Sequence, residues 1–356
     1  MATANLKDVA RRAGVHPATA SRALNERTVG MVSPETAARV REAADALGYR
    51  VNRVARGLKT RRSHAIGMLI PDITNPFFPG MVRGAEDRLH QAGYTLILAD
   101  TDNDPEQDRR HHDVMLERRV DGFLLATSRR RDPVVEELIA SDMPFVLVNR
   151  TVDRGKVAAV IPDDHAGTAL AVEHLHDLGH RVIGHIAGPS ITSTGARRAA
   201  GFVAAVRALG LDPGPGAEAS AFTVEAGLAA ALEVLGARSR PTAIVAANDL
   251  VALGVLDAAL AHGLSCPADF SLVGFNDMAF VDRLQPSLTT VRIDEYELGR
   301  RAASVLISLV EDPSGARETV MLTPELVVRG STSRPLARPP ADPSAGGDGP
   351  RLRGLD

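Results

Sequence analysis

Seven short apolar runs alternate with stretches of helical character over most of the chain beyond Ser63. The runs are AIGMLIP, TLILADT, GFLLAT, FVLVN, VIGHIAG, TAIVAAND and FSLVGFND. Runs of this kind are typical of buried parallel strands, and the helical stretches between them supply the crossover connections. The pattern therefore predicts an α/β fold for the larger part of the chain.

The order of the runs predicts two similar α/β lobes. We expect the first lobe at about 63–161 with a return of the chain at 295–320, and the second at 162–290. The carboxyl ends of the strands and the loops that follow them meet in the cleft between two such lobes, which is the natural place for a ligand. This is the periplasmic-binding-protein-like architecture.

The first 62 residues differ from the remainder in charge. They contain 13 Lys and Arg residues against five Asp and Glu residues, whereas the whole chain has a net charge of −3. A small basic segment joined to an acidic body suits a nucleic-acid reader attached to a sensing domain, because attraction to phosphates depends on the local charge. The alternative, a solvated basic tail, disagrees with the helical periodicity of the segment.

Three short helices are predicted in this basic segment. Asn5 caps the first, Pro17 begins the second after a turn at Gly14, and Ser33 caps a third that stops at Gly48. Such an arrangement describes a helix-turn-helix unit, whose second helix enters the DNA major groove. The outward face of that helix is small and hydroxylated with one guanidinium group, which suits close contact with a grooved polyanion.

The motif LKDVARRAGV....TASRALN, followed by V....R......LGY..N..AR.L, resembles the lactose/galactose repressor (LacI/GalR) family over about 5–331. The resemblance implies an all-α helix-turn-helix DNA-binding domain at 1–50, a hinge helix or linker at 51–62 and a two-lobed effector and dimerisation domain at 63–331. It also implies a homodimer, with a tetramer possible, on palindromic double-stranded operator DNA. The Pro- and Gly-rich segment 332–356 is expected to be a disordered tail.

The resemblance assigns base reading to Pro17, Ala18 and Arg22. Arg22 can donate two hydrogen bonds to guanine, whereas Pro17 and Ala18 offer only apolar contact, for example to a thymine methyl group. Thr19, Ser21 and Asn25 are expected to anchor phosphates and thereby set the register. The remaining candidates in the head are Asn5 and His16; His16 stands where the family commonly has a Ser cap, so it either caps the helix weakly or reaches a phosphate.

The segment NRVARGLKT, residues 52–60, matches the family's hinge helix. That helix folds when two subunits meet over the minor groove. The resemblance makes Leu58 the wedge at the central base step, lets Ala55 bring the paired helices close together and places Lys59 and Asn52 at the DNA. A plain flexible linker is the alternative.

Candidate ligand contacts stand just past the ends of the predicted strands. Aromatic rings there offer flat surfaces for stacking, and Asn and Asp side chains beside Arg suit vicinal hydroxyl groups. The resemblance implies effector contact at these positions, most consistently at Arg198. The candidates are Phe77, Phe78, Asn149, Arg150, Arg198, Phe222, Asn248, Asp249, Asn276 and Asp277.

Three of these candidates have equally good structural explanations. Asp249 and Asp277 precede helices and can cap them, and Phe222 can fill the core. Thr192 stands where the purine repressor has a base-binding Arg, which favours a sugar over a purine as effector. Whether the effector releases the DNA or, as in purine-type members, is needed for binding is left open.

The sequence predicts no enzymatic activity, no metal site and no cofactor. The single cysteine, Cys266, argues against a disulfide framework or a Cys-based zinc site, and the spacing of His174, His176 and His180 does not place three imidazoles on one helical face. No phosphate-binding loop or nucleophile elbow occurs. The absence of a long apolar run and of a signal peptide predicts a cytoplasmic protein without membrane contact. It also disfavours a sugar receptor that uses only the cleft, since such a receptor would need export.

Overall fold

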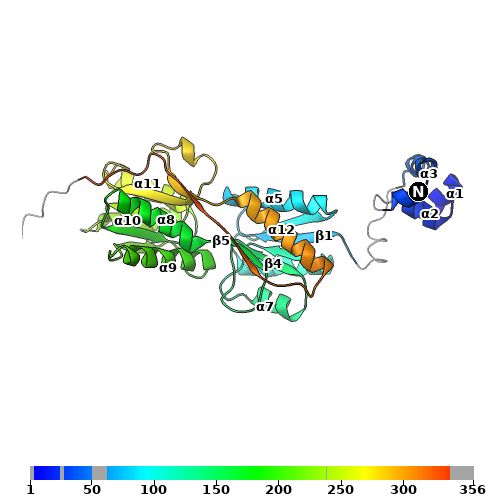
Figure 1. Cartoon of the computed structure of the whole chain (residues 1–356), viewed down its shortest axis with the longest axis horizontal. Helices are drawn as coiled ribbons and strands as arrows, with labels where there is room; N and C mark the ends of the chain where they lie inside the picture. Colours follow the sequence, from blue (N-terminus) through cyan, green and yellow to red (C-terminus); the bar gives the residue numbers. More distant parts are fainter. Residues whose placement is uncertain (1–3, 25–27, 50–61, 238, 337–356) are drawn as a thin grey trace, which may run out of the picture. The chain divides into compact units, whose positions relative to one another are not determined.

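The computed structural model describes residues 4–24, 28–49, 62–237 and 239–336. The chain divides into two compact units, Met1–His64 and Ala65–Asp356 (Figure 1). Within the described ranges, no helix is both long and apolar enough to cross a membrane. Five residues predicted to contact DNA lie outside these ranges: Asn25, Asn52, Ala55, Leu58 and Lys59.

The N-terminal unit consists of α1 (Leu6–Ala13), α2 (Pro17–Ala23), the 3-10 turn η1 (Val29–Met31) and α3 (Pro34–Ala46). The predicted starts of the three helices are confirmed, and Gly14 ends α1 in the left-handed conformation at φ 65°. A small core of its own holds the unit together, made by Val9, Ala20, Val40 and their neighbours.

The first lobe of the second unit contains a six-stranded sheet in the order β11-β5-β4-β3-β1-β2, with every pair parallel. In β1, Met68 packs toward α5 and α12, whereas Leu69 packs toward α6 and α7, so helices cover both faces. The elements are β1 (Ala65–Ile70), α5 (Phe77–Gln91), β2 (Thr95–Asp100), α6 (Pro105–Glu117), β3 (Phe123–Leu125), α7 (Pro133–Ala140), β4 (Phe145–Val148), β5 (Ala159–Pro162), α12 (Glu295–Glu311) and β11 (Thr319–Leu322).

The second lobe contains a six-stranded sheet in the order β12-β10-β9-β8-β6-β7. Helices α8 and α9 cover one face, and α10 and α11 cover the other. The elements are α8 (Asp164–Asp177), β6 (Ile183–Ala187), α9 (Ser193–Ala208), β7 (Gly216–Glu218), α10 (Val224–Gly236), β8 (Ala243–Ala246), α11 (Asp249–Ala261), β9 (Ser271–Asn276), η2 (Val281–Arg283), β10 (Thr289–Arg292) and β12 (Glu325–Val327).

The chain passes between the lobes three times, at 163, 293–294 and 323–324. The sequence predicted parallel strands, but β12 pairs antiparallel with β10. The last passage between the lobes explains this difference. Strand β10 runs toward the first lobe, whereas β12 enters from it and so runs the other way. The apolar core continues from one lobe into the other, because one buried cluster contains both Leu306 of the first lobe and Phe275 of the second.

Two further predictions need correction. The run TLILADT forms β2 at the sheet edge and is not buried; Leu98 is 40% exposed. Thr332 and Ser333, predicted to belong to the disordered tail, are bound to the second lobe: Nε2 of His174 lies 3.0 Å from Oγ1 of Thr332, and Ser333 donates its backbone N–H to Oγ of Ser271. These contacts are polar, so apolar patterning gave no sign of them. Residues 337–356 lie outside the described ranges.

Candidate DNA-reading helix and ligand cavity

Helix α2 presents the face expected to read DNA. Ala20 and Ala23 are buried in the core of the head, while Ala18, Ser21 and Arg22 are exposed and Pro17 and Thr19 are half-buried. The Arg22 guanidinium makes no hydrogen bond or ion pair with any described residue, and it is therefore available for a base edge.

Two residues at helix starts act as caps. Oδ1 of Asn5 accepts hydrogen bonds from the backbone N–H groups of Lys7 and Asp8, and Nδ1 of His16 accepts one from Ala18 at 3.2 Å. Of the two roles considered for His16, the structure shows the capping role, and only Nε2 of its ring is left for a phosphate. Helix α2 thus begins at a fixed residue, which sets where Arg22 lies along it.

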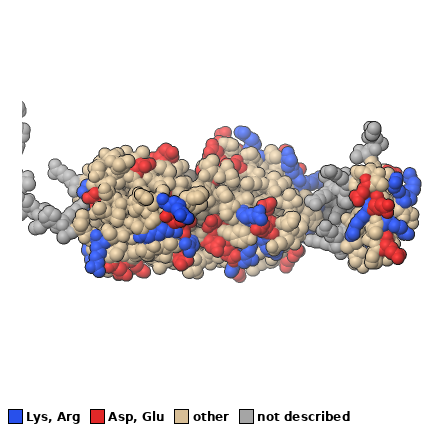
Figure 2. Space-filling model, turned by 90° about the horizontal axis from the view of Figure 1, so that it is seen from above, with Lys and Arg blue, Asp and Glu red and all other residues tan. Residues whose placement is uncertain are grey.

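The visible face of the α/β unit carries Lys, Arg, Asp and Glu side chains interspersed with one another, without an extended basic patch (Figure 2). Attraction of this face to DNA is weak, because opposite charges close together cancel at the distance of a phosphate. The excess of 13 basic over five acidic residues in the first 62 residues supplies the positive charge instead.

A cavity of about 490 Å³ lies between the lobes of the α/β unit. Its walls come from the ends of β1, β2, β3, β4, β6, β7, β8 and β9 and from the loops and helix starts that follow them, as expected where strand ends meet. Eight of the ten predicted ligand contacts line it: Phe77, Phe78, Asn149, Arg150, Arg198, Phe222, Asn248 and Asn276.

Arg198 of α9 is fixed in the wall by three different contacts. Its Nε donates to Asp164 at 2.9 Å, its Nη1 donates to the carbonyl oxygen of Ala247 at 2.7 Å, and its guanidinium carbon lies 3.7 Å from the centre of the Phe275 ring. Burial raises the pKa of Asp164, while the charge of Arg198 opposes that rise. The contacts hold Arg198 ready for a ligand without a change of side-chain conformation.

Polar atoms in the cavity wall are buried without partners. Oδ1 of Asn149, Oδ1 of Asn276 and Nε of Arg150 have no hydrogen-bond partner among the described residues. Burial, together with the charges of Arg129 and Arg198, lowers the pKa of Arg150 to about 10, so the group stays charged at neutral pH. Buried polar atoms without partners are unfavourable, so these three side chains gain from any rearrangement that gives the atoms a partner.

Several charged wall residues were missed by the sequence analysis, among them Asp108 and Arg129. Asp108 of α6 lines the cavity with an unpartnered Oδ1, and burial raises its pKa. Arg129, also in the wall, follows β3. The strand-end argument used for Asn149 would have found Arg129 after GFLLAT, whereas nothing in the sequence distinguishes Asp108 from a solvated helix residue.

Asp249 and Asp277 do not line the cavity, and their prediction as ligand contacts needs correction. Asp249 accepts hydrogen bonds from Oγ1 of Thr290 and the backbone N–H of Met278, and Asp277 forms ion pairs in the second lobe. The reason is geometric, because the chain changes direction after both strands: α11 begins at Asp249, and Asn276 and Asp277 have positive φ angles. Asn248 and Asn276 face the cavity, so the residues that follow them point away.

The described residues contain no group of three or more His, Cys, Asp and Glu side chains that could hold a metal ion. His180, one of the histidines considered in the sequence, is buried, with Nδ1 2.9 Å from Oγ1 of Thr242 and Nε2 3.0 Å from Oγ of Ser271. Its role in the described structure is to join α8 to the second sheet.

The sequence and the fold both match known regulatory proteins. The family of bacterial regulatory proteins described as the lacI family matches residues 5–52, and the periplasmic binding protein-like domain matches residues 172–332. The ribose operon repressor of Escherichia coli (strain K12) is 34% identical over 92% of this chain and 99% of its own length. The repressor PurR of Mannheimia succiniciproducens is 31% identical over 93% and 99%.

Among solved structures, the lac repressor dimer bound to operator and the anti-inducer ONPF superposes with a TM-score of 0.82. It is 28% identical over 93% of this chain and 100% of that chain. A LacI family transcriptional regulator from Enterococcus faecium with bound ribose gives a TM-score of 0.67 at 30% identity, over 76% of this chain and 99% of that chain.

Proposed function

Because the chain belongs to the lacI family of bacterial regulatory proteins, we propose that it is a transcriptional repressor that reads a palindromic operator and is controlled by a sugar bound in the cavity. The amide side chains of Asn149 and Asn276 beside the guanidinium of Arg150 in the cavity wall are the observation that carries the sugar assignment. A hydroxyl group both donates and accepts, so one polyol satisfies a mixed set of this kind.

Other features of the cavity support the same ligand class. Phe77 and Phe78 pack edge to face with their ring centres 5.5 Å apart, and both contribute to the wall, where they offer apolar surface to a sugar ring. Thr192 caps α9 by accepting a hydrogen bond from the backbone N–H of Gly195, so this position offers no cation to a purine base. The ribose bound to the Enterococcus faecium relative is in agreement.

We propose a homodimer, since a palindromic operator presents two equivalent half-sites. Exposed apolar side chains support this assembly. Leu98 on the edge strand β2 is 40% exposed, and Phe280 after β9 is 77% exposed. The repressor is expected to act in the cytoplasm, where its operator lies.

A matched pair of variants tests the two halves of the proposal. Purified protein is incubated with random DNA fragments at moderate salt, and the retained fragments are sequenced; separately, the melting temperature is measured with and without D-ribose. Arg22→Ala is expected to lose about 1–3 kcal/mol of discrimination between operator and mismatched DNA, while its response to ribose stays normal. Arg198→Ala is expected to keep operator selection and lose the ribose response.

Arg39→Ala serves as the control for Arg22→Ala, because Arg39 is an exposed cation of the same unit on α3. Equal discrimination by wild type and Arg22→Ala would remove Arg22 from base reading. A normal ribose titration with Arg198→Ala would contradict the assignment of the cavity.

A further inference from the structure

The chain that leaves β9 turns through backbone conformations that side chains rarely adopt. Asn276 has φ 111° and Asp277 has φ 58°. A residue other than glycine keeps such a conformation only where the surrounding structure enforces it. Because Asn276 lines the cavity, the aim of its side chain depends on what holds the other side of the turn.

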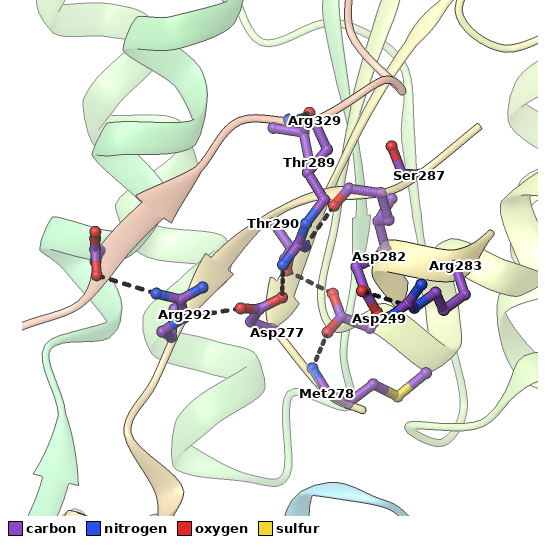
Figure 3. Close-up of polar contacts among 12 residues, drawn as sticks. Asp249, Asp277, Met278, Asp282, Arg283, Ser287, Thr289, Thr290, Arg292 and Arg329 are labelled. Carbon is purple, nitrogen blue, oxygen red and sulfur yellow. Dashed lines mark hydrogen bonds and ion pairs between the residues drawn. The ribbon is translucent and has the colours of Figure 1, made fainter. Parts of the chain in front are cut away.

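Two carboxylates hold that other side (Figure 3). The Asp277 carboxylate accepts from Nη2 of Arg329 at 2.6 Å and from Nε of Arg292 at 2.8 Å, and its side chain is only 8% exposed. Oδ2 of Asp249 accepts the backbone N–H of Met278 at 2.8 Å. The turn is therefore fixed at Asp277 by its side chain and at Met278 by its backbone.

The two arginines differ in how firmly they are placed. Arg329 is 16% exposed, and its Nη1 donates to the carbonyl oxygen of Leu288 at 2.8 Å. Arg292 is 45% exposed, and its second partner, Glu325, lies 3.4 Å away at the surface. Exposed ion pairs contribute little because water screens them. Arg329 is therefore the main anchor of Asp277.

We propose that Asp277 is a positioning residue of the ligand cavity, which through Arg329 holds the 276–278 turn so that the Asn276 amide faces the effector. Asp277 does not touch the effector. This inference rests on the proposed function, because it requires an effector that Asn276 contacts.

The first test needs no ligand. Asp277→Asn removes the charge but keeps the shape, and Asn tolerates φ 58°. Backbone amides of 277–280 are expected to exchange hydrogen at least about tenfold faster in this variant, since opening of the turn becomes more frequent. The control is Asp282→Asn, whose carboxylate pairs with the exposed Arg283 and with no other described residue. Unchanged exchange in Asp277→Asn would overturn the proposal, whatever the protein binds.

The second test is a double-mutant cycle with D-ribose, measured by calorimetry. Asp277→Asn is expected to weaken ribose binding about tenfold in the wild-type background and not at all in an Asn276→Gly background, because no amide is left to aim. Glycine takes φ 111° without strain, so Asn276→Gly is expected to fold. An equal loss in both backgrounds would show that Asp277 acts on the fold in general and not through Asn276.

Failure of the proposed function gives a different pattern. If wild type and Arg198→Ala respond equally to ribose or show no response, the sugar assignment fails. The exchange measurement still decides whether Asp277 holds the turn, because it is made on the protein without ligand.

Discussion

His185 shows how a single buried residue makes this fold depend on pH. It lies in β6, stacked on Phe202 with ring centres 4.8 Å apart and planes at 17°. Its Nδ1 lies 2.8 Å from the carbonyl oxygen of Val245 and must carry the hydrogen, since a carbonyl only accepts, while Nε2 is buried without a partner. Burial lowers the pKa of His185 from 6.5 to about 4.

The expected consequence is a loss of stability in acid. The unfolded chain takes up a proton near pH 6.5 and the folded chain only near pH 4, so this contribution is complete above 6.5 and falls between those values. The loss amounts to about 3 kcal/mol at full effect. Urea unfolding at pH 7 and pH 5 measures it. In His185→Leu the pH dependence is expected to be smaller, and an equal dependence in both proteins would rule out His185 as its source.

At the level of single residues, the sequence predicted which strand ends carry ligand contacts but not which way each side chain points. Asn276 and Asp277 are adjacent and both polar, and only the path of the backbone after β9 sends one to the cavity and the other to Arg329. Arg329 is 52 positions away in the sequence from Asp277. A pairing over that distance leaves no local pattern.

Helices α5 and α12 of the first lobe pack backbone to backbone at two glycines. A Cβ atom at Gly299 would collide with the carbonyl oxygen of Met81, and one at Gly84 would collide with that of Tyr296. Both glycines are needed for the spacing of the helices, not for an unusual backbone conformation. The two helices cover one face of the first sheet, so their separation determines how that core closes.

Gly299→Ala is expected to destabilise the α/β unit by about 1–3 kcal/mol, because overpacking forces the backbones apart. Unfolding in urea, followed by circular dichroism, measures the change. Gly30→Ala, at a site with no atom within 4 Å of the added methyl group, is the control and should leave that transition unchanged. A stability equal to wild type in Gly299→Ala would mean that the helices shift apart without cost.

The sequence predicted seven of the twelve strands that the structure describes. All seven apolar runs contain strands, because buried parallel strands are continuously apolar. The strands β5, β7, β10, β11 and β12 were not predicted, although they have three or four residues, as do the predicted strands β3, β4 and β8, so length does not explain the difference. Several of them lie next to the passages between the lobes, so their position depends on tertiary structure and not on local sequence.

Assembly is the property of the whole molecule that the function most requires. Strand β2 forms one edge of the first sheet, and its Leu98 is as exposed, at 40%, as Val182 before β6 in the second lobe. A lysine on an exposed edge strand opposes pairing with another chain. Leu98 therefore provides a direct test of the proposed homodimer.

Leu98→Lys is expected to shift the protein from dimer to monomer and to weaken operator binding, since each half-site is then bound alone. Sedimentation velocity reports the mass, and Val182→Lys is the matched control. A wild-type protein that sediments as a monomer would contradict the homodimer outright, and an unchanged dimer in Leu98→Lys would place the interface elsewhere.

The three passages between the lobes limit how this protein can be recombined with its relatives. A chimera that exchanges one lobe would have to join foreign chain at three places and rebuild the buried cluster shared by Leu306 and Phe275. The boundary at His64 is crossed by the chain only once, and each unit keeps its own core. New pairs of signal and operator are therefore best made by transplanting the head as one piece.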